Sequence, residues 1–398
     1  MLHAWLGSAP RPSAVCALIA LAALLLSVLG GHPHGIDPAW IAALLCGIPI
    51  LYTAVRELIC TRKIHADLLA AAALIAAAAV GEPRAAGWIA LIMQFGTMLE
   101  EQIILRAQRS VDALYTQERS VCIDAYAAPL VRSAQRTAQQ LILLAPLLAG
   151  AIWWGTDDID RAVTALVVFC PCAFVHATPM AVSAAIASLA RRGILLRTGS
   201  ALERLSRMEN IVLTPEVLSP TGYMPADAQH LITQLRRMGM HPVLLAPADA
   251  KDAVHIAAQA GIRDVRTALP PQNDPFAVSS ALVQRAADGR HPAHGDCLHI
   301  SMGGTSRSTA DVVCPAEDLR HLPAMLGTAR QMRQKIEQNT LFGCMLNFIA
   351  LGLAACGYLS PLSGALWHNA AAIFIVLNAA LLFTTEEREK KIAFSTSL

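Results

Sequence analysis

The sequence predicts a polytopic α-helical membrane protein that carries one small α/β domain. Of its 398 residues, 55% are hydrophobic and only 15% are charged, whereas soluble domains carry about 25% charged residues. Long apolar stretches occupy both ends of the chain, and they flank a segment from Arg197 to Asn339 in which short strand-like runs alternate with amphipathic helices. The first feature places most of the chain in a lipid bilayer, and the second places a folded domain between membrane helices.

The apolar stretches predict about eight transmembrane helices, because about 20 apolar residues are needed to cross a bilayer. They are Ser13–Gly31, Pro38–Leu58, Ala66–Val80, Ala85–Ile104, Ala138–Trp154, Ala162–Leu189, Leu341–Tyr358 and Leu362–Phe383. An even number of spans places both termini on the same side of the membrane.

The distribution of lysine and arginine predicts which side that is. Basic residues follow the second, fourth, sixth and eighth stretches, while the opposite loops are short and poor in them. By the positive-inside rule, both termini and both large loops are cytoplasmic. We therefore expect a multi-pass protein of the plasma (inner) membrane with the lipid bilayer as its first partner. No basic stripe interleaved with aromatic residues is present, so nucleic-acid binding is not expected.

Strand-like runs define the predicted domain between the sixth and seventh stretches. They are Asn210–Thr214, Pro242–Ala246, Asp264–Leu269, Cys297–Met302 and Asp311–Cys314. Alternation of such runs with helices over short connections is typical of a doubly wound parallel sheet. A helix over Asp318–Thr340 is expected to run directly into the seventh stretch, and Gly289–Gly295 is expected to be a loop.

The triplet Cys170-Pro171-Cys172 lies inside the sixth apolar stretch. Proline removes a backbone donor and clashes with the preceding turn, so the helix is expected to open there. An open turn lets two residues that are two positions apart converge on one ion, and thiolates select soft metals such as copper(I) and zinc. The alternative is a proline kink flanked by two small apolar cysteines.

The run "CPCAFVHATPMAVSAAIASLARRGILLRTGSALERLSRMENIVL", which starts at Cys170, resembles the heavy-metal-transporting branch of the P-type ATPases. In that family a CPC triplet in the metal-conducting helix is followed by Thr-Pro and by a connector into the phosphorylation domain. This chain has Thr178-Pro179, Arg191–Leu195 and Ala201–Glu203 in the same order. The resemblance implies an eight-helix membrane core and a haloacid-dehalogenase-like domain.

The resemblance also shows what this chain has lost. Where the family has the aspartate that attacks the γ-phosphate of ATP, this chain has Thr214, and Pro215 stands at the position of the following lysine. A carboxylate forms a labile acyl phosphate, whereas a hydroxyl needs a base and would form a stable ester. The magnesium-binding Gly-Asp-Gly-x-Asn-Asp segment has no counterpart either. We therefore expect no catalytic residue, no ATP as cofactor and no ATP hydrolysis.

Two whole domains of the family are also missing from the interior of the chain. Only a linker stands where the actuator domain would be, and Ser219–Asp227 leaves no room for a nucleotide-binding domain. The predicted segments are residues 1–104 (first four transmembrane helices), 105–137 (cytoplasmic linker), 138–190 (helix pair with the triplet), 191–338 (reduced phosphorylation domain), 339–384 (last two helices) and 385–398 (cytoplasmic tail).

Two further residues, Asn347 and His368, occupy places where the family carries metal-selecting residues. Imidazole binds zinc, copper, iron or nickel, so the resemblance implies a metal site of Cys170, Cys172, Asn347 and His368. The alternatives are that Asn347 forms a hydrogen bond between helices and that His368 is an interfacial histidine at a helix start.

The expected function is that of a metal-binding or regulatory pseudo-transporter, which binds a soft metal, copper(I) or zinc, and does not hydrolyse ATP. Its partner would be another metal transporter or a metalloenzyme assembly protein. One alternative is a metal cation transporter subunit that depends on the ATPase domains of another chain. A second alternative is a structural partner that binds no metal.

Overall fold

A computed structural model describes residues 14–30, 37–61, 67–115, 129–219, 228–247, 252–268, 274–285, 296–303, 310–314 and 319–380. The chain divides into two compact units. The first comprises Met1–Arg106, Ser133–Thr178 and Glu337–Ala379, and the second comprises Ala107–Arg132, Pro179–Ile336 and Ala380–Leu398.

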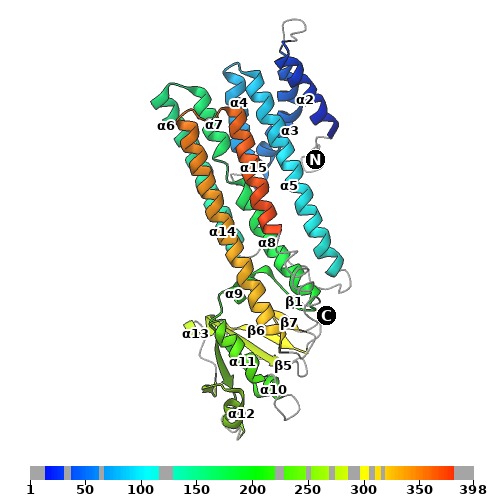
Figure 1. Cartoon of the computed structure of the whole chain (residues 1–398), viewed down its shortest axis with the longest axis vertical. Coiled ribbons are helices and arrows are strands. Elements are labelled where there is room, and N and C mark those ends of the chain that lie inside the picture. The colour runs from blue at the N-terminus through cyan, green and yellow to red at the C-terminus, as the bar shows by residue number, and fades with distance from the viewer. Residues whose placement is uncertain are drawn as a thin grey trace, which may run out of the picture. The chain divides into compact units, whose positions relative to one another are not determined.

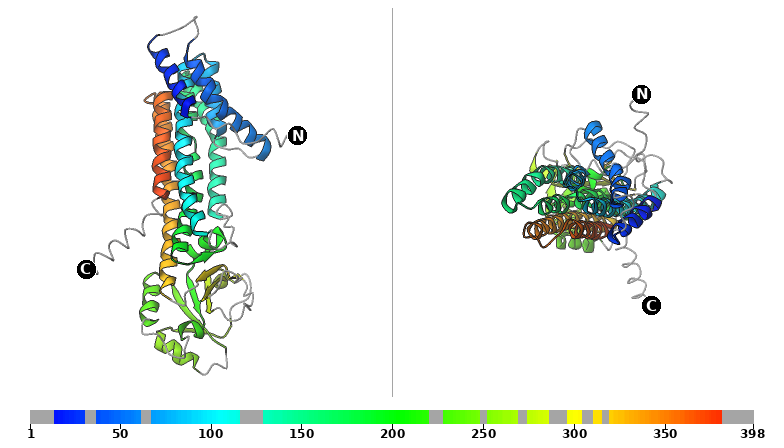
Figure 2. Two further views of the ribbon diagram at one scale, coloured as in Figure 1. Left: turned by 90° about the vertical axis from the view of Figure 1, so that its right-hand side faces the viewer. Right: turned by 90° about the horizontal axis from the view of Figure 1, so that it is seen from above.

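Helices make up the described part of the first unit. They are α2 (Ala14–Val28), α3 (Ala39–Thr61), α4 (Asp67–Ala79), α5 (Pro83–Tyr115), α6 (Pro129–Thr156), α7 (Ile159–Val168), α8 (Cys172–Arg191), α14 (His321–Ala355) and α15 (Pro361–Ala380), of which α5, α6, α8, α14 and α15 continue beyond the unit. Each apolar stretch predicted from the sequence overlaps one of these helices, and α7 and α8 share the sixth. The helices of this unit run lengthwise beside one another (Figures 1 and 2).

Within the described residues, four helices are long and apolar enough to cross a membrane. These are Ala39–Cys60, Pro129–Thr156, His321–Ala355 and Pro361–Ala379, while Val15–Val28 and Leu68–Ala79 are shorter apolar helices. Helices that can span a bilayer are therefore confirmed, and the total of about eight spans stays a prediction. Helix also occupies both ends of the predicted linker, because α5 continues to Tyr115 and α6 begins at Pro129.

Small residues let the helices of the first unit approach closely. A Cβ atom added at Gly364 of α15 would lie 2.9 Å from Thr164 Cγ2 and 3.0 Å from Val168 Cγ1, both on α7. A Cβ atom at Gly87 of α5 would lie 2.9 Å from Leu24 Cδ2 of α2. Membrane helices associate through van der Waals contact of this kind, because lipid tails are as apolar as leucine.

A seven-stranded sheet forms the core of the second unit. Its strands are β1 (Leu195–Leu196), β2 (Asn210–Leu213), β3 (His241–Leu245), β4 (Asp264–Arg266), β5 (Ser280–Arg285), β6 (Leu298–Met302) and β7 (Val312–Cys314). Their order is β1-β7-β6-β5-β2-β3-β4. Strands β2 to β7 pair in parallel, as predicted, and β1 pairs with β7 antiparallel.

Strand β5 is not among the runs predicted from the sequence. It is nevertheless central, because it pairs with β2 on one side and β6 on the other. Its sequence, SALVQR, is short, begins with serine and directly follows the one-turn helix α13 (Pro275–Val278). Its first four residues are buried, so the sheet buries a run whose own β-propensity is weak.

Two charged side chains connect the helices around this sheet. Glu203 of α9 (Gly199–Ser206) is 3% exposed. Its carboxylate accepts a hydrogen bond from the Leu130 N–H at the start of α6 (2.6 Å) and pairs with Arg207 (2.8 Å). Arg330 of α14 donates to the carbonyl oxygens of Met238 and Met208, and Met238 follows α11 (Ala228–Arg237). As predicted, α14 runs unbroken from this domain into the seventh apolar stretch.

Gly364→Leu should destabilise the first unit, because its side chain would overlap two β-branched side chains that have little freedom to move. Overpacking of this kind costs about 1–3 kcal/mol, so we expect a lower unfolding temperature in detergent. Gly352→Leu is the matched control, since a Cβ atom at Gly352 meets nothing within 4 Å. Equal unfolding temperatures for the two variants would contradict the close contact between α15 and α7.

Cys314 of β7 should resist alkylation in the folded protein. It is fully buried, and burial raises the pKa of its thiol to about 12. Since the thiolate is the reacting form, maleimide at pH 8 should modify Cys314 only after unfolding in denaturant. The exposed Cys356 should react at once in the same sample, with both sites followed by peptide mass spectrometry.

Candidate metal-binding site

The Cys-Pro-Cys triplet separates α7 from α8, as the proline predicts. Helix α7 ends at Val168 with Phe169 as its C-cap residue, and α8 begins at Cys172. Cys170 and Pro171 therefore belong to neither helix. The N-terminus of α7 is fixed by Asp158, whose carboxylate accepts hydrogen bonds from the N–H groups of Asp160 and Arg161.

Cys170 lies in an apolar setting. The residue is 3% exposed and packs in one cluster with Leu69 of α4, Ile142 and Ala145 of α6, and Phe169. These neighbours supply no polar side chain. A cation at Cys170 would depend on the sulfur atom and on groups from other helices.

Helix α14 contacts three successive residues at the break. Ala350 and Ala354 pack against Val168, and the ring of Phe348 meets that of Phe169 edge-on at 5.2 Å between centroids. The side-chain amide of Asn347 donates to the Cys170 carbonyl oxygen over 3.1 Å. The alternative in which Asn347 forms a hydrogen bond between helices is therefore confirmed, while its role as a metal ligand stays a prediction.

His368 of α15 is buried rather than interfacial. It lies about two turns after the start of the helix at Pro361 and is 3% exposed. Its neighbour Trp367 packs in the cluster of Val168, Ala350 and Ala354. The alternative of a histidine at a helix start is wrong, because His368 lies within α15, seven residues after Pro361, and is buried.

Among the described side chains, no group of three or more His, Cys, Asp or Glu residues is placed to hold a metal ion. The side chain of Cys172 lies outside the described part of the chain. The predicted set of Cys170, Cys172, Asn347 and His368 thus stays a prediction as a single site.

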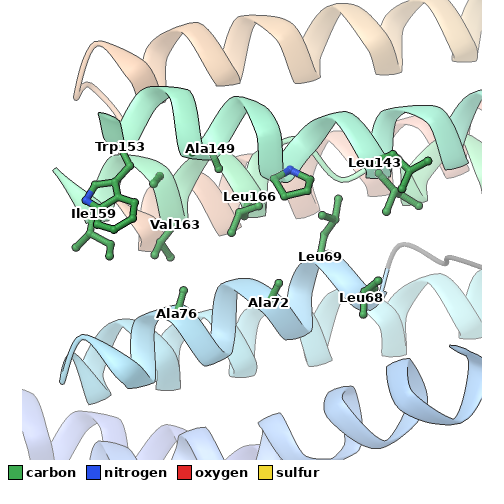
Figure 3. Close-up of a pocket in the computed structure, with 14 residues that line it drawn as sticks. Leu68, Leu69, Ala72, Ala76, Leu143, Ala149, Trp153, Ile159, Val163 and Leu166 are labelled. Carbon is green, nitrogen blue, oxygen red and sulfur yellow. The ribbon is translucent and has the colours of Figure 1, made fainter. Parts of the chain in front are cut away.

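An apolar cavity of about 400 Å³ adjoins the cluster around Cys170. Its walls come from α4, α6 and α7, and Figure 3 shows Trp153 beside Ile159 at one end and Leu68 near Leu143 at the other. Leu69 and Ile142 line it and also pack with Cys170. No charged residue is among those lining it, so the cavity offers an ion no polar route to the cysteine.

The buried polar side chains described in the first unit carry no carboxylate, lysine or arginine. They are Ser27, Gln94, Thr164, Thr178, Asn339, Asn347 and His368. Among the buried side chains described in this unit, the cysteine sulfurs are the groups that could balance the charge of a bound soft ion.

Thr214 occupies the end of β2 at the point where the strand order reverses. Strand β3 lies on one side of β2 and β5 on the other, and ligands of open α/β sheets bind at such a point, beyond the carboxyl ends of the strands. The Thr214 N–H donates to the Val283 carbonyl (3.4 Å), so pairing with β5 continues one residue past the strand. The residue is 9% exposed.

Among the described residues in line with Thr214 across β5 and β6, the side chains are neutral. Thr214 precedes a one-turn helix, α10 (Pro215–Leu218), in which Pro215 takes the first position and Glu216 is exposed. In the next register row Gln284 of β5 pairs with Ser301 of β6, and the Gln284 Oε1 atom lies 3.1 Å from His299 Nε2. Thr214, Gln284 and Ser301 supply hydrogen-bonding groups at this edge, but no carboxylate. The alignment of these three side chains was not predicted, because strand β5 was not predicted.

Comparison with known proteins gives relatives of a single kind. No protein-family model matches the sequence. The chain is 28% identical over 220 residues to a zinc/cadmium/lead-transporting P-type ATPase of Shigella sonnei, which covers 52% of this chain and 30% of that protein. It is 30% identical over 170 residues to a zinc-exporting P-type ATPase of Mycobacterium marinum, covering 41% and 22%. It thus spans less than a third of the length of these relatives.

Solved structures support the same fold. Two crystal structures of a zinc-transporting PIB-type ATPase, each in a different state, match with a TM-score of 0.54, at 15% and 17% identity. The matches cover 93% and 92% of this chain and 99% of each of those chains. From these relatives and this fold, we conclude that the chain is a partial member of the heavy-metal-transporting P-type ATPase family.

Proposed function

We propose that this protein binds a soft heavy-metal ion in the membrane at Cys170 and Cys172 and does not hydrolyse ATP. It would act as a regulatory or assembly partner of a metal transporter or a metalloenzyme. The observation that carries the proposal is the contrast between two positions. The metal-binding triplet is present at a helix break, while the end of β2 carries Thr214, which cannot form an acyl phosphate.

The surroundings of Thr214 support the loss of phosphoryl transfer. That reaction depends on positioning and on metal ions that neutralise the charge of the phosphates. The residues described beside Thr214 at the strand ends, Gln284 and Ser301, are neutral, and Glu216 is exposed at the start of α10. Residues 116–128 and 220–227 are also too few for further folded domains, which need about 40 residues or more.

Charge balance favours a divalent ion over copper(I). With neutral buried polar groups around it, a site of two thiolates becomes neutral with a divalent ion and stays negative with a monovalent one. A net charge at membrane depth is costly. The relatives described above are transporters of zinc, cadmium and lead, or of zinc, which fits a divalent soft metal as the cargo.

Orientation follows from the basic residues. The arginines near the end of α8 and on α14 before Glu337 would lie on the cytoplasmic side, with both termini there and the protein in the plasma (inner) membrane. In that arrangement the sheet domain is cytoplasmic and is available to another chain.

Metal binding can be measured directly on the purified full chain. Equilibrium dialysis against cadmium or zinc, followed by elemental analysis, should give about one ion per chain for a single thiolate site. The variant Cys170→Ser/Cys172→Ser should fall to background, because a serine hydroxyl is a poor ligand for soft ions. Cys356→Ser is the matched control, since Cys356 is exposed and lies beyond α14.

Two results would count against this proposal. A parent protein with no bound metal would leave only the structural-partner alternative. Stoichiometric copper(I) binding that displaces cadmium would overturn the argument from charge balance.

No phosphoenzyme should form with γ-labelled ATP. The proposal predicts no acid-stable, hydroxylamine-labile adduct, because Thr214 is not a carboxylate. A full-length relative with its aspartate intact serves as the positive control. Were such an adduct to appear on this chain only when a second ATPase chain is added, the subunit alternative would replace the proposal.

A further inference from the structure

We propose that Asn347 is a positioning residue of the triplet: its amide N–H holds the Cys170 carbonyl and thereby fixes the open turn, and it is not a metal ligand. This inference rests on the proposed function for its metal-dependent part only. The geometry of the turn can be tested without metal.

The Cys170 carbonyl accepts a hydrogen bond from a donor outside its own two helices. In a regular helix it would accept the N–H four residues on, but Cys170 lies between the end of α7 and the start of α8. At membrane depth no water is available, and non-helical backbone persists only where protein groups satisfy it. The Asn347 amide supplies that donor at 3.1 Å.

Asn347 can hold a fixed position because α14 is packed on both sides of it. Its buried face carries Asn339, Gly343, Asn347, Ala350 and Ala354 at helical spacing. Phe348 contacts Phe169, the residue before Cys170, and Ala350 and Ala354 contact Val168. The hydrogen bond is thus one of three adjacent contacts between α14 and the break.

The chemistry of the amide sets its orientation. If its two ends were exchanged, the amide oxygen would face the carbonyl oxygen of Cys170, and two acceptors would meet without a proton between them. The nitrogen therefore faces the carbonyl. The remaining amide oxygen is a hard, neutral ligand, which thiolate-binding soft metals do not prefer.

Two variants separate positioning from ligation. Asn347→Ala removes the side chain, and Asn347→Met removes the donor but introduces a soft thioether ligand of similar reach. In metal-free protein, both should raise the rate of maleimide labelling at Cys170 about five- to tenfold, as expected for the loss of one hydrogen bond that holds a buried site closed. Labelling is followed by peptide mass spectrometry on the full chain in detergent.

In the presence of cadmium, both variants should also bind more weakly than the parent by a similar factor. Asn369→Ala is the matched control, because the Asn369 amide donates to Ala365 of its own helix over 2.9 Å, and it should leave Cys170 labelling unchanged. Elution as a single species confirms that each variant is folded.

Each outcome distinguishes the hypotheses. Tighter cadmium binding by Asn347→Met than by Asn347→Ala would identify Asn347 as a ligand and overturn the inference. Unchanged Cys170 labelling in both variants would also overturn it, even if the parent binds metal. If the parent binds no metal, the proposed function fails, and faster labelling in both variants still supports the positioning role.

Discussion

The first unit depends on one constraint: every backbone polar group at membrane depth must find a partner within the protein. A proline in an apolar stretch disturbs that pairing locally, because it lacks a backbone donor and clashes with the preceding turn. At the residue before this proline, the Asn347 amide of α14 donates to the Cys170 carbonyl. The aromatic contact between Phe348 and Phe169 and the alanine contacts to Val168 hold α14 in register with the break. The geometry of the break therefore depends on two segments that are far apart in sequence.

The same unit holds its helices together with small residues and amides and, among the buried side chains that the structure describes, without charges. Gly364 brings α15 against Thr164 and Val168. Near the other end of the same helix, Asn378 donates to Asn339 of α14 over 2.6 Å. Asn339 and Asn347 lie on one buried face of α14. Hydrogen bonds of these two side-chain amides connect that face to α15 and to the helix break. Where the buried groups described are neutral, thiolate sulfurs would balance the charge of a bound ion. The charge of the ion then determines whether a site of two thiolates is neutral overall.

Local features, such as helix breaks and strands, could be predicted from the sequence, but contacts between distant residues could not. Pro171 predicts the helix break by its covalent structure alone, and the strand before Thr214 is readable from its apolar run. The burial of His368 was not predicted because it depends on packing between helices, whereas the start of α15 at Pro361 lies within one residue of the predicted stretch. Strand β5 was overlooked because its position between β2 and β6, rather than its own composition, makes it a strand. The partner of Asn347 was beyond prediction, since an amide can donate or accept and nothing local says which carbonyl it meets.

In the second unit, the backbone and not the side chain determines the position at the end of β2. Backbone pairing sets the position of Thr214, since its N–H donates to the Val283 carbonyl and continues the parallel ladder. That hydrogen bond does not depend on which side chain the residue carries. Phosphoryl transfer, in contrast, requires a carboxylate and a metal at the same place. Under the proposed function, a threonine at this place excludes the reaction, while the strand, its switch point and the attachment of α14 through Arg330 are kept. Because α14 carries both Arg330 and Asn347 in one unbroken helix, what remains of the domain is tied covalently to the residue that holds the Cys170 turn.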